Sequence, residues 1–207
     1  MAALPGELGP LLQGDGERER LRAGVAVLPR RLAGVELLAV VSGVGKVAAA
    51  RAACVLVAEG ACGVLVVGTC GALVRGLQPG DMLHCKTAFQ ADLAVREGRQ
   101  VDPDPTWSAA WRSVAPGEEG WFLTADRPVI TPWRRLRLAR AFQGPCVADM
   151  ETAAVGAVAA ASGLPWAALR VVTDHAGLGT GRRFRQNYPT MGGRPADTLR
   201  SLVPQLT

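Results

Sequence analysis

The chain has 207 residues, of which 49% are hydrophobic and 20% are charged. This balance is typical of a globular protein and excludes an intrinsically disordered chain. A chain of this length can bury roughly 70% of its unfolded surface, so it needs neither disulfides nor a structural metal to fold. No apolar run reaches the about 18 residues of a membrane span. The start lacks a basic region followed by an apolar stretch, so we expect no signal peptide and no membrane partner.

The formal net charge is +5, and the densest basic runs lie at 134–140 and 182–185. Such runs can bind nucleic acid or a phosphorylated ligand, but no nucleic-acid module surrounds either of them. We therefore interpret them as a solvated helix face and a loop, and expect no nucleic-acid partner. The five cysteines are scattered and contain no CxxC pair, which indicates a reduced, cytoplasmic protein.

Apolar runs typical of strands alternate with alanine-rich runs typical of helices, which predicts an α/β fold. In chain order, strands are expected at 35–42, 64–68, 82–88, 90–95, 121–125, 146–149 and 166–173, with 82–88 and 90–95 antiparallel. Helices are expected at 46–59, 107–114, 131–142, 150–162 and 196–203. Residues 98–105 and the Gly/Arg-rich stretch 175–190 are expected to be loops.

The glycine loop at 43–48 (GVGKVA) follows a strand and opens a helix, close to the dinucleotide-binding fingerprint. However, the next strand, 64–68, ends in Val-Val-Gly, where a dinucleotide-binding fold would place an acid for the ribose. The loop is no P-loop either, because Val40 and Val47 stand where a Gly and a Ser or Thr are needed. An NAD-dependent oxidoreductase therefore stays a weaker alternative.

Three further segments contain residues that could bind a ligand or take part in a reaction. Small residues at 68–73 (GTCGAL) let a flat ligand approach the backbone, and the hydroxyl of Thr69 can donate a hydrogen bond to it. Met150 and Glu151 stand between a short strand and a helix, and Asp174 follows a buried-looking strand. Carboxylates at the ends of strands in an α/β fold are where ligands normally bind.

Together with residues 42–50 (SGVGKVAAA), these segments resemble the superfamily of purine nucleoside phosphorylases and methylthioadenosine/S-adenosylhomocysteine nucleosidases, over about residues 36–180. The resemblance implies one three-layer αβα domain over 1–207 with a mixed, twisted central sheet. It implies no metal and no organic cofactor, and the sequence has no His/Cys ligand cluster. Because relatives are dimers or hexamers, it also implies a homo-oligomer, with a dimer as the first expectation.

The resemblance also implies roles for residues. Met150 would pack against the sugar, and Glu151 would accept hydrogen bonds from the ribose hydroxyls. Asp174 would protonate the purine as the glycosidic bond breaks, because a departing purine is a poor anion unless it gains a proton. The remaining substrate contacts implied by the family motifs are Thr69, Cys70, Gly71 and Val129.

Hydrolysis and phosphorolysis remain open alternatives. In the hydrolytic branch a Glu near the amino end activates water, and Glu7 matches it loosely. The arginines that bind phosphate in hexameric phosphorylases are absent, because this chain has Val66 at one position and no arginine over 6–12. The balance favours a hydrolase; in a phosphorylase, inorganic phosphate would be a co-substrate. Its site would then need arginines from elsewhere, with Arg30, Arg31 and those of 182–185 as the candidates.

The sequence determines the substrate less closely than the type of reaction. The family has an aromatic residue that stacks on the base where this chain has Pro128, which weakens methylthioadenosine as the substrate. Enzymes that cleave futalosine tend to carry Asn where this chain has Asp174. A branch associated with hopanoid synthesis is also compatible, and a nucleoside-binding protein without catalysis is the alternative outside enzymes.

Overall fold

The computed structural model describes residues 1–12 and 19–206, and its centre is a six-stranded mixed sheet. The strands follow the order β6-β5-β7-β8-β4-β9. Their bounds are β4 Val64–Ala72, β5 Met82–Gln90, β6 Gln100–Val101, β7 Glu118–Thr124, β8 Cys146–Asp149 and β9 Trp166–His175. The first three residues of β5 also pair antiparallel with β9, so the sheet curls round and closes a circuit of five strands. The expected mixed, twisted sheet is confirmed.

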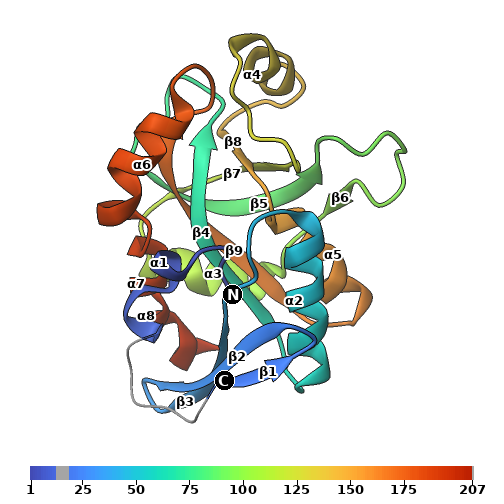
Figure 1. Cartoon of the computed structure of the whole chain (residues 1–207), viewed down its shortest axis with the longest axis vertical. Coiled ribbons are helices and arrows are strands. Elements are labelled where there is room, and N and C mark those ends of the chain that lie inside the picture. Colours follow the sequence, from blue (N-terminus) through green and yellow to red (C-terminus); the bar gives the residue numbers. More distant parts are fainter. Residues whose placement is uncertain (13–18, 207) are drawn as a thin grey trace.

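Helices cover both faces of this sheet, which gives the three layers (Figure 1). On one side α2 (Lys46–Ala58) packs against α5 (Thr152–Ala161), and both are rich in alanine, so they approach the sheet closely. The other side holds α3 (Pro105–Val114), α7 (Arg194–Asp197) and α8 (Leu199–Leu202). The exposed α4 (Pro132–Ala139) stands apart, and a short 3-10 turn (Val203–Gln205) ends the described chain.

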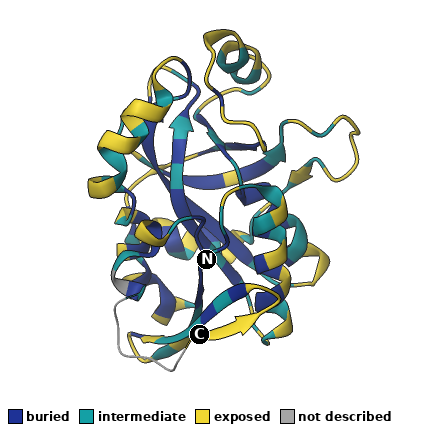
Figure 2. Cartoon of the chain, viewed as in Figure 1, coloured by how far each residue is buried: buried dark blue, intermediate teal, exposed yellow. Residues whose placement is uncertain are grey.

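Two large hydrophobic cores result, one on each face of the sheet, and the buried strands run between them (Figure 2). A third, smaller cluster contains Leu73, Leu123 and Val129. Strand β4 contributes to both cores, since Val64 and Val66 face one and Val67 faces the other. An internal strand buried on both faces reads as a continuous apolar run, as residues 64–67 do. Among the described helices, none has both the length and the apolar character needed to cross a bilayer.

A second, antiparallel sheet joins the first through the amino-terminal residues. It consists of β1 (Arg20–Arg22), β2 (Val25–Leu32) and β3 (Val35–Val40). Ala2 pairs with Val41 beside β3, and the carbonyl of Met1 accepts a hydrogen bond from the amide of Val67 in β4. Residues 1–3 therefore lie between the two sheets and lead the chain into α1 (Pro5–Leu8) beside β4.

Three expected elements are wrong, the first being the loop expected at 98–105, which contains the short strand β6. Residues 90–95 do not form a strand, because β5 ends at Gln90 and its antiparallel partner is β6. The side chain of Asp92 instead binds Lys46 and the amide of Asp126, which fixes a turn there. Residues 175–190 are not one loop, because Thr180–Met191 form the helix α6. Their high content of Gly and Arg concealed a helical spacing of larger residues.

The strand expected at 64–68 is longer than its apolar run. Strand β4 continues to Ala72, and its pairing with β9 runs on through Thr69 opposite Val171, with an irregularity after Cys70. The small residues at 68–72 are therefore part of a strand and not a turn after it. The remaining predicted strands and helices are present with boundaries shifted by a few residues, except that the predicted helix 196–203 is broken into α7, α8 and the final 3-10 turn.

Candidate functional site

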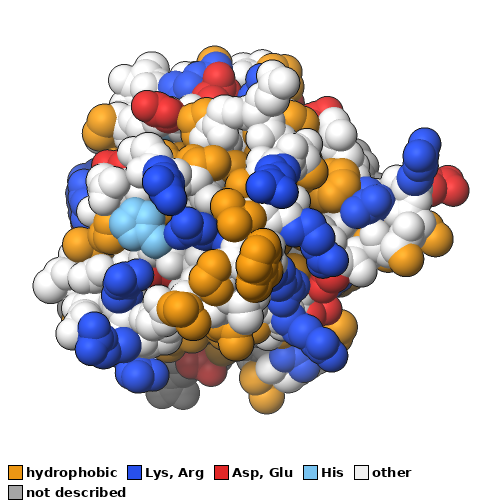
Figure 3. All heavy atoms as spheres, turned by 90° about the horizontal axis from the view of Figure 1, so that it is seen from above, with side chains coloured by type: hydrophobic (Ala, Val, Ile, Leu, Met, Phe, Trp, Pro, Cys, Tyr) orange, Lys and Arg blue, Asp and Glu red, His pale blue; other side chains and the backbone are white. Residues whose placement is uncertain are grey.

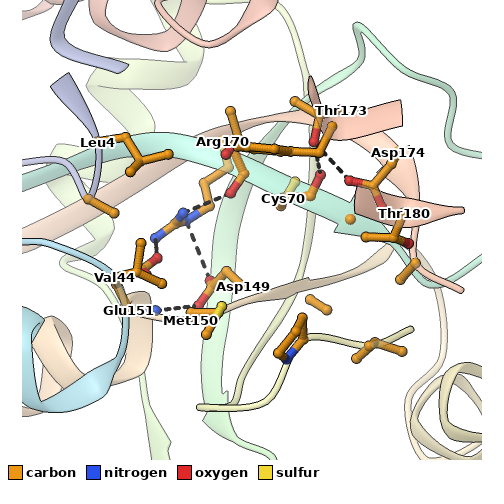
Figure 4. A pocket seen from close by; sticks show the side chains of 18 of the residues that line it. Leu4, Val44, Cys70, Asp149, Met150, Glu151, Arg170, Thr173, Asp174 and Thr180 are labelled. Carbon is orange, nitrogen blue, oxygen red and sulfur yellow. Dashed lines mark hydrogen bonds and ion pairs between the residues drawn. The ribbon is translucent and has the colours of Figure 1, made fainter. Parts of the chain in front are cut away.

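One pocket brings together every site residue predicted from the sequence. It is formed by the ends of β8 and β9, the last part of β4, and segments of α1 and α6. In Figure 4, Leu4, Val44 and Glu151 lie at one end of the pocket, Asp174 and Thr180 at the other, and Arg170 between them. The predicted residues that line it are Glu7, Thr69, Cys70, Gly71, Val129, Met150, Glu151 and Asp174.

Glu7 is held rigidly at the floor of this pocket, with only 1% of its surface exposed. One carboxylate oxygen accepts hydrogen bonds from the amides of Ala3 and Leu4, both at 3.0 Å. The other accepts from the amide of Thr69 at 2.8 Å and from its hydroxyl at 2.7 Å. Four donors on one carboxylate fix its position.

This arrangement changes the role available to Thr69. We expected its hydroxyl to donate a hydrogen bond to the ligand, but its proton is directed at Glu7. A hydroxyl has two acceptor lone pairs besides its proton, so Thr69 can still accept a hydrogen bond from a bound ligand.

A buried arginine to which the sequence assigned no role holds one end of the pocket together. Arg170 lies in the middle of β9 and is 2% exposed. Its Nη2 donates to a carboxylate oxygen of Glu151 at 3.1 Å, and its Nη1 donates to the carbonyl of Thr69 at 2.8 Å. The available signal was a single arginine inside an otherwise apolar strand, since such a charge is buried only when it is paired.

Glu151 is the acid at that end, and it precedes α5. Burial raises the pKa of its carboxyl group, while Arg170 acts against this shift. Its second oxygen accepts a hydrogen bond from the amide of Gly45 at 3.0 Å, which connects it to the start of α2. Each oxygen of Glu151 therefore has one protein partner and retains capacity for hydroxyl groups of a ligand.

Asp149 holds the backbone of Glu151 in place. One of its oxygens accepts from the hydroxyl of Thr124 at 2.7 Å and from the amides of Glu151 and Thr152 at 3.0 and 3.1 Å. The other oxygen lies 3.5 Å from Nε of Arg170. Because Asp149 satisfies free amides at the start of α5, it fixes where that helix begins and where Glu151 points.

Asp174 stands at the opposite end, 4% exposed, at the end of β9. Burial raises the pKa of its carboxyl group, while hydrogen bonds from Thr173 and Thr180 act in the opposite direction. One oxygen accepts from the hydroxyl of Thr173 at 2.9 Å, and the other finds no hydrogen-bond partner within the described part of the chain. A buried carboxyl oxygen without a partner is suited to meet a polar atom of a ligand. His175 is turned away from this point and contacts the carbonyl of Leu77 at 3.0 Å.

Helix α6 adds residues that the loop prediction missed. Thr180 and Phe184 both line the pocket, one helical turn apart. Phe184 gives the pocket an aromatic ring, although Pro128 occupies the position where the family has one. The spacing of four residues from Thr180 to Phe184 and on to Tyr188 was the signal that could have identified the helix.

None of the candidate phosphate ligands lines the pocket, although Arg183, on α6, is near enough to Asp174 to lower the pKa of that carboxyl group. Arg30 donates to the carbonyls of Pro29 and Leu11 at 2.8 and 2.9 Å, and Arg31 pairs with the exposed Glu36. Among the described residues, the arginines that line the pocket are Arg170, which is engaged by its partners, and Arg127. In the described parts of the chain, no group of His, Cys, Asp and Glu side chains could hold a metal ion.

Comparisons with known proteins agree with this geometry. A model of the phosphorylase superfamily matches residues 1–204. No protein with a curated description matches the chain in sequence. Among solved structures, the 5′-methylthioadenosine/S-adenosylhomocysteine nucleosidase of Helicobacter pylori with butyl-thio-DADMe-Immucillin-A is 23% identical, with a TM-score of 0.93 over 99% of this chain and 96% of that chain.

Two other solved structures are similar. The futalosine hydrolase of Helicobacter pylori is 23% identical, with a TM-score of 0.93 over 99% of this chain and 95% of that one. The S-adenosylhomocysteine nucleosidase of Streptococcus pyogenes, in complex with 5-methylthiotubericidin, is 25% identical, with a TM-score of 0.91 over 100% and 95% of the two chains. At 23% identity, the Helicobacter structures show that the fold is shared.

The buried charge of Arg170 yields a prediction for stability. Replacing it in Arg170→Gln leaves buried carboxylates without their cation and should cost about 3–5 kcal/mol of unfolding free energy at pH 7.5. The folded-state pKa of Glu151, already raised, rises further without the arginine, so the folded protein binds more protons than the unfolded one. The unfolding free energy of the variant should therefore fall as pH rises. Its loss relative to the wild type should be larger at pH 7.5 than at pH 5.5.

Urea unfolding at the two pH values measures this difference. The matched control is Arg31→Gln, which removes an arginine from an exposed pair with Glu36 and should change the free energy by about 1 kcal/mol or less. If Arg170→Gln lost as little unfolding free energy as the control, the buried network would not depend on this charge.

Proposed function

Because this chain belongs to the phosphorylase superfamily, we propose that it is a nucleosidase that hydrolyses the N-glycosidic bond of a purine nucleoside. The observation that carries the proposal is the buried carboxylate of Glu7, which lines the same pocket as the buried Asp174. A carboxylate repels phosphate but can polarise water, and the phosphate-binding arginines of the phosphorylases have no counterpart among the described residues at this position. The nucleosidases named above have the same fold.

Asp174 is the proposed general acid. Breaking the glycosidic bond leaves an oxocarbenium-like sugar and places negative charge on the departing purine. The raised pKa of Asp174 keeps a larger fraction of the carboxyl group protonated, so that it can donate a proton to the base. Asp174 lines the pocket, and one of its oxygens has no hydrogen-bond partner among the described residues.

Glu151 and Met150 are proposed to hold the ribose. Glu151 retains acceptor capacity on both oxygens, so it can receive the two vicinal hydroxyls, and each charge-assisted bond contributes about 1.5–3 kcal/mol. Met150 lines the pocket beside it and offers a flexible apolar surface to the sugar. Glu7 is then proposed to orient the water that attacks the ribosyl carbon.

The remaining substrate contacts support a methylthioadenosine- or S-adenosylhomocysteine-like nucleoside. Leu4 and Val44 make the end of the pocket beyond Glu151 apolar, and Val129 and Phe184 add apolar surface. Thr69, Cys70 and Gly71 form the wall against which sugar and base would lie. We propose that the reaction needs neither a metal nor an organic cofactor, and that the protein works in the cytoplasm, as the five unpaired cysteines favour.

We further propose that the protein forms a homodimer that covers the pocket mouth. Val44 lines the pocket and is 52% exposed, and Val47, Ile130 and Leu178, each within three residues of a lining residue, are at least 56% exposed. Figure 3 shows exposed apolar side chains gathered together with lysines and arginines around them. Apolar groups exposed together on a folded protein mark a contact surface.

The first experiment incubates the protein with methylthioadenosine, S-adenosylhomocysteine, adenosine and inosine, with and without phosphate. We expect free base without phosphate, at a rate that phosphate does not raise, and a loss of about 100-fold or more in Glu7→Gln. Chromatography of the base and the sugar measures the outcome. Base released only with phosphate, together with a sugar 1-phosphate, would establish the phosphorylase alternative.

Asp174→Asn tests the general acid. It should lower kcat by about 100-fold or more and leave adenine binding, measured by calorimetry, within about threefold. In the wild type, kcat should fall as pH rises through the raised pKa of Asp174, because the proton donor is lost. The amide introduced by the substitution cannot titrate, so this decline should be absent from the variant, and a decline that persists would assign the acid to another group.

Sedimentation equilibrium tests the dimer. The wild type should sediment as a dimer at micromolar concentration, and the double variant Val47→Glu/Ile130→Glu should sediment as a monomer because it places charge in the apolar contact. A wild type that sediments as a monomer would overturn this proposal and leave the proposed reaction untouched.

A further inference from the structure

We infer that Tyr188, which lies behind the pocket and does not line it, is a positioning residue that sets the place of Glu7. The inference rests on the proposed function, because it concerns the group that activates water. Two observations support it: the hydrogen bonding at the first turn of α1, and the shape of the space that the tyrosine ring fills.

Helix α1 cannot hold Glu7 by itself. It has four residues, Pro5–Leu8, and an isolated single turn is unstable because one hydrogen bond does not offset the entropy of fixing its residues. Glu7 is the third residue of this turn, and its carboxylate reaches back to the amide of Leu4, the residue that precedes the helix. This is one half of a capping box.

The other half of the capping box is missing from the local sequence. A helix start normally receives a side-chain oxygen from the preceding residue, which accepts from the second or third amide of the helix. Leu4 has no polar side-chain atom, so the amide of Gly6 has no acceptor of that kind. The hydroxyl of Tyr188, which comes from α6, lies beside Gly6 and is placed to accept from this amide.

Two glycines leave the space that the tyrosine occupies. A Cβ on Gly6 would lie 2.6 Å from the hydroxyl oxygen of Tyr188, which is closer than real Cβ contacts. A Cβ on Gly192 would lie 3.0 Å from the ring of the same tyrosine. The ring is therefore fitted between two backbone segments that carry no side chain, and it limits how far α1 can move toward α6.

The same helix also contacts the substrate side of the pocket. The ring of Phe184, which lines the pocket, lies 5.1 Å from the ring of Tyr188. Asn187 donates a hydrogen bond to the carbonyl of Thr173 at 2.7 Å, next to Asp174. Helix α6 is thus attached at two points, one beside the proposed acid and one beside the proposed base.

The charge of Glu7 explains why an uncharged hydroxyl is suited to this position. Burial and the nearby Glu7 carboxylate raise the pKa of Tyr188, while the Gly6 amide acts in the opposite direction. The hydroxyl therefore stays neutral at the pH where the enzyme works, and it caps the turn without adding a second negative charge next to Glu7.

The test compares Tyr188→Ala and Tyr188→Phe in the wild type and in the Glu7→Gln background. In the wild type, Tyr188→Ala should lower kcat about tenfold to a hundredfold with KM changed by less than about threefold, because displacement of a catalytic group acts on the reaction step. Tyr188→Phe keeps the ring and should lower kcat by less than Tyr188→Ala. In the Glu7→Gln background, Tyr188→Ala should lower the residual kcat by less than about twofold.

Controls separate positioning from folding. Gln186→Ala changes an exposed residue of the same helix and should leave kcat and the melting temperature at their wild-type values. Gly6→Ala should reduce kcat because its Cβ meets the tyrosine, and adding Tyr188→Ala should restore part of the loss by removing the obstruction. This second pair keeps the inference testable if Tyr188→Ala alone fails to fold.

The outcomes are distinct. Equal losses of kcat from Tyr188→Ala in the wild type and in the Glu7→Gln background would show a purely structural role and overturn the inference, as would an unchanged kcat with Glu7 present. Either result leaves the proposed function standing as long as the wild type releases base. A wild type that releases no base overturns the proposed function, and with it this inference.

Discussion

The arrangement of the pocket depends on one buried cation. Arg170 extends from the middle of β9 and meets Glu151 and Asp149, with the carbonyl of Thr69 beside it. A guanidinium group is the side chain suited to this task, because its five donors lie in one plane and can serve several oxygens at once. Without it, two carboxylates would have to be buried next to each other, and one of them would be protonated instead.

The close approach of these charges limits what can stand at Gly68. A Cβ there would lie 2.9 Å from Nη1 of Arg170 and 3.1 Å from a carboxylate oxygen of Glu7. Any larger residue would separate the cation from the pocket floor. The glycine that ends the predicted strand 64–68 is therefore required by the close approach of side chains from β9 and α1.

The sequence predicted the site residues that stand at strand ends but not those whose partners come from distant elements. Motifs that follow a strand, such as Met150-Glu151 and Asp174, could be placed because strand ends in an α/β fold meet at ligand sites. Arg170 could not be assigned a role, since its partners come from β4 and β8 and no local spacing reveals them. Helix α6 was missed because glycine and arginine outweighed the periodicity of Thr180, Phe184 and Tyr188. The alternation of strands and helices depends on hydrophobic pattern alone, so the fold was more predictable than these contacts.

The closed circuit of five strands has a consequence for how copies of the chain can meet. Exposed strand edges offer unpaired backbone groups, and proteins associate or aggregate through them. Because β9 pairs with β4 along its length and with β5 over Leu169–Val171, the part of the strand that carries Arg170 offers no such edge. The outer strand of the small sheet, β1, has only three residues and two of them are arginines, which discourages backbone pairing with a neighbour. Copies of the chain that associated would therefore do so through side chains and not by extending a sheet through β9 or β1, and such contacts would leave the strands around the pocket in register.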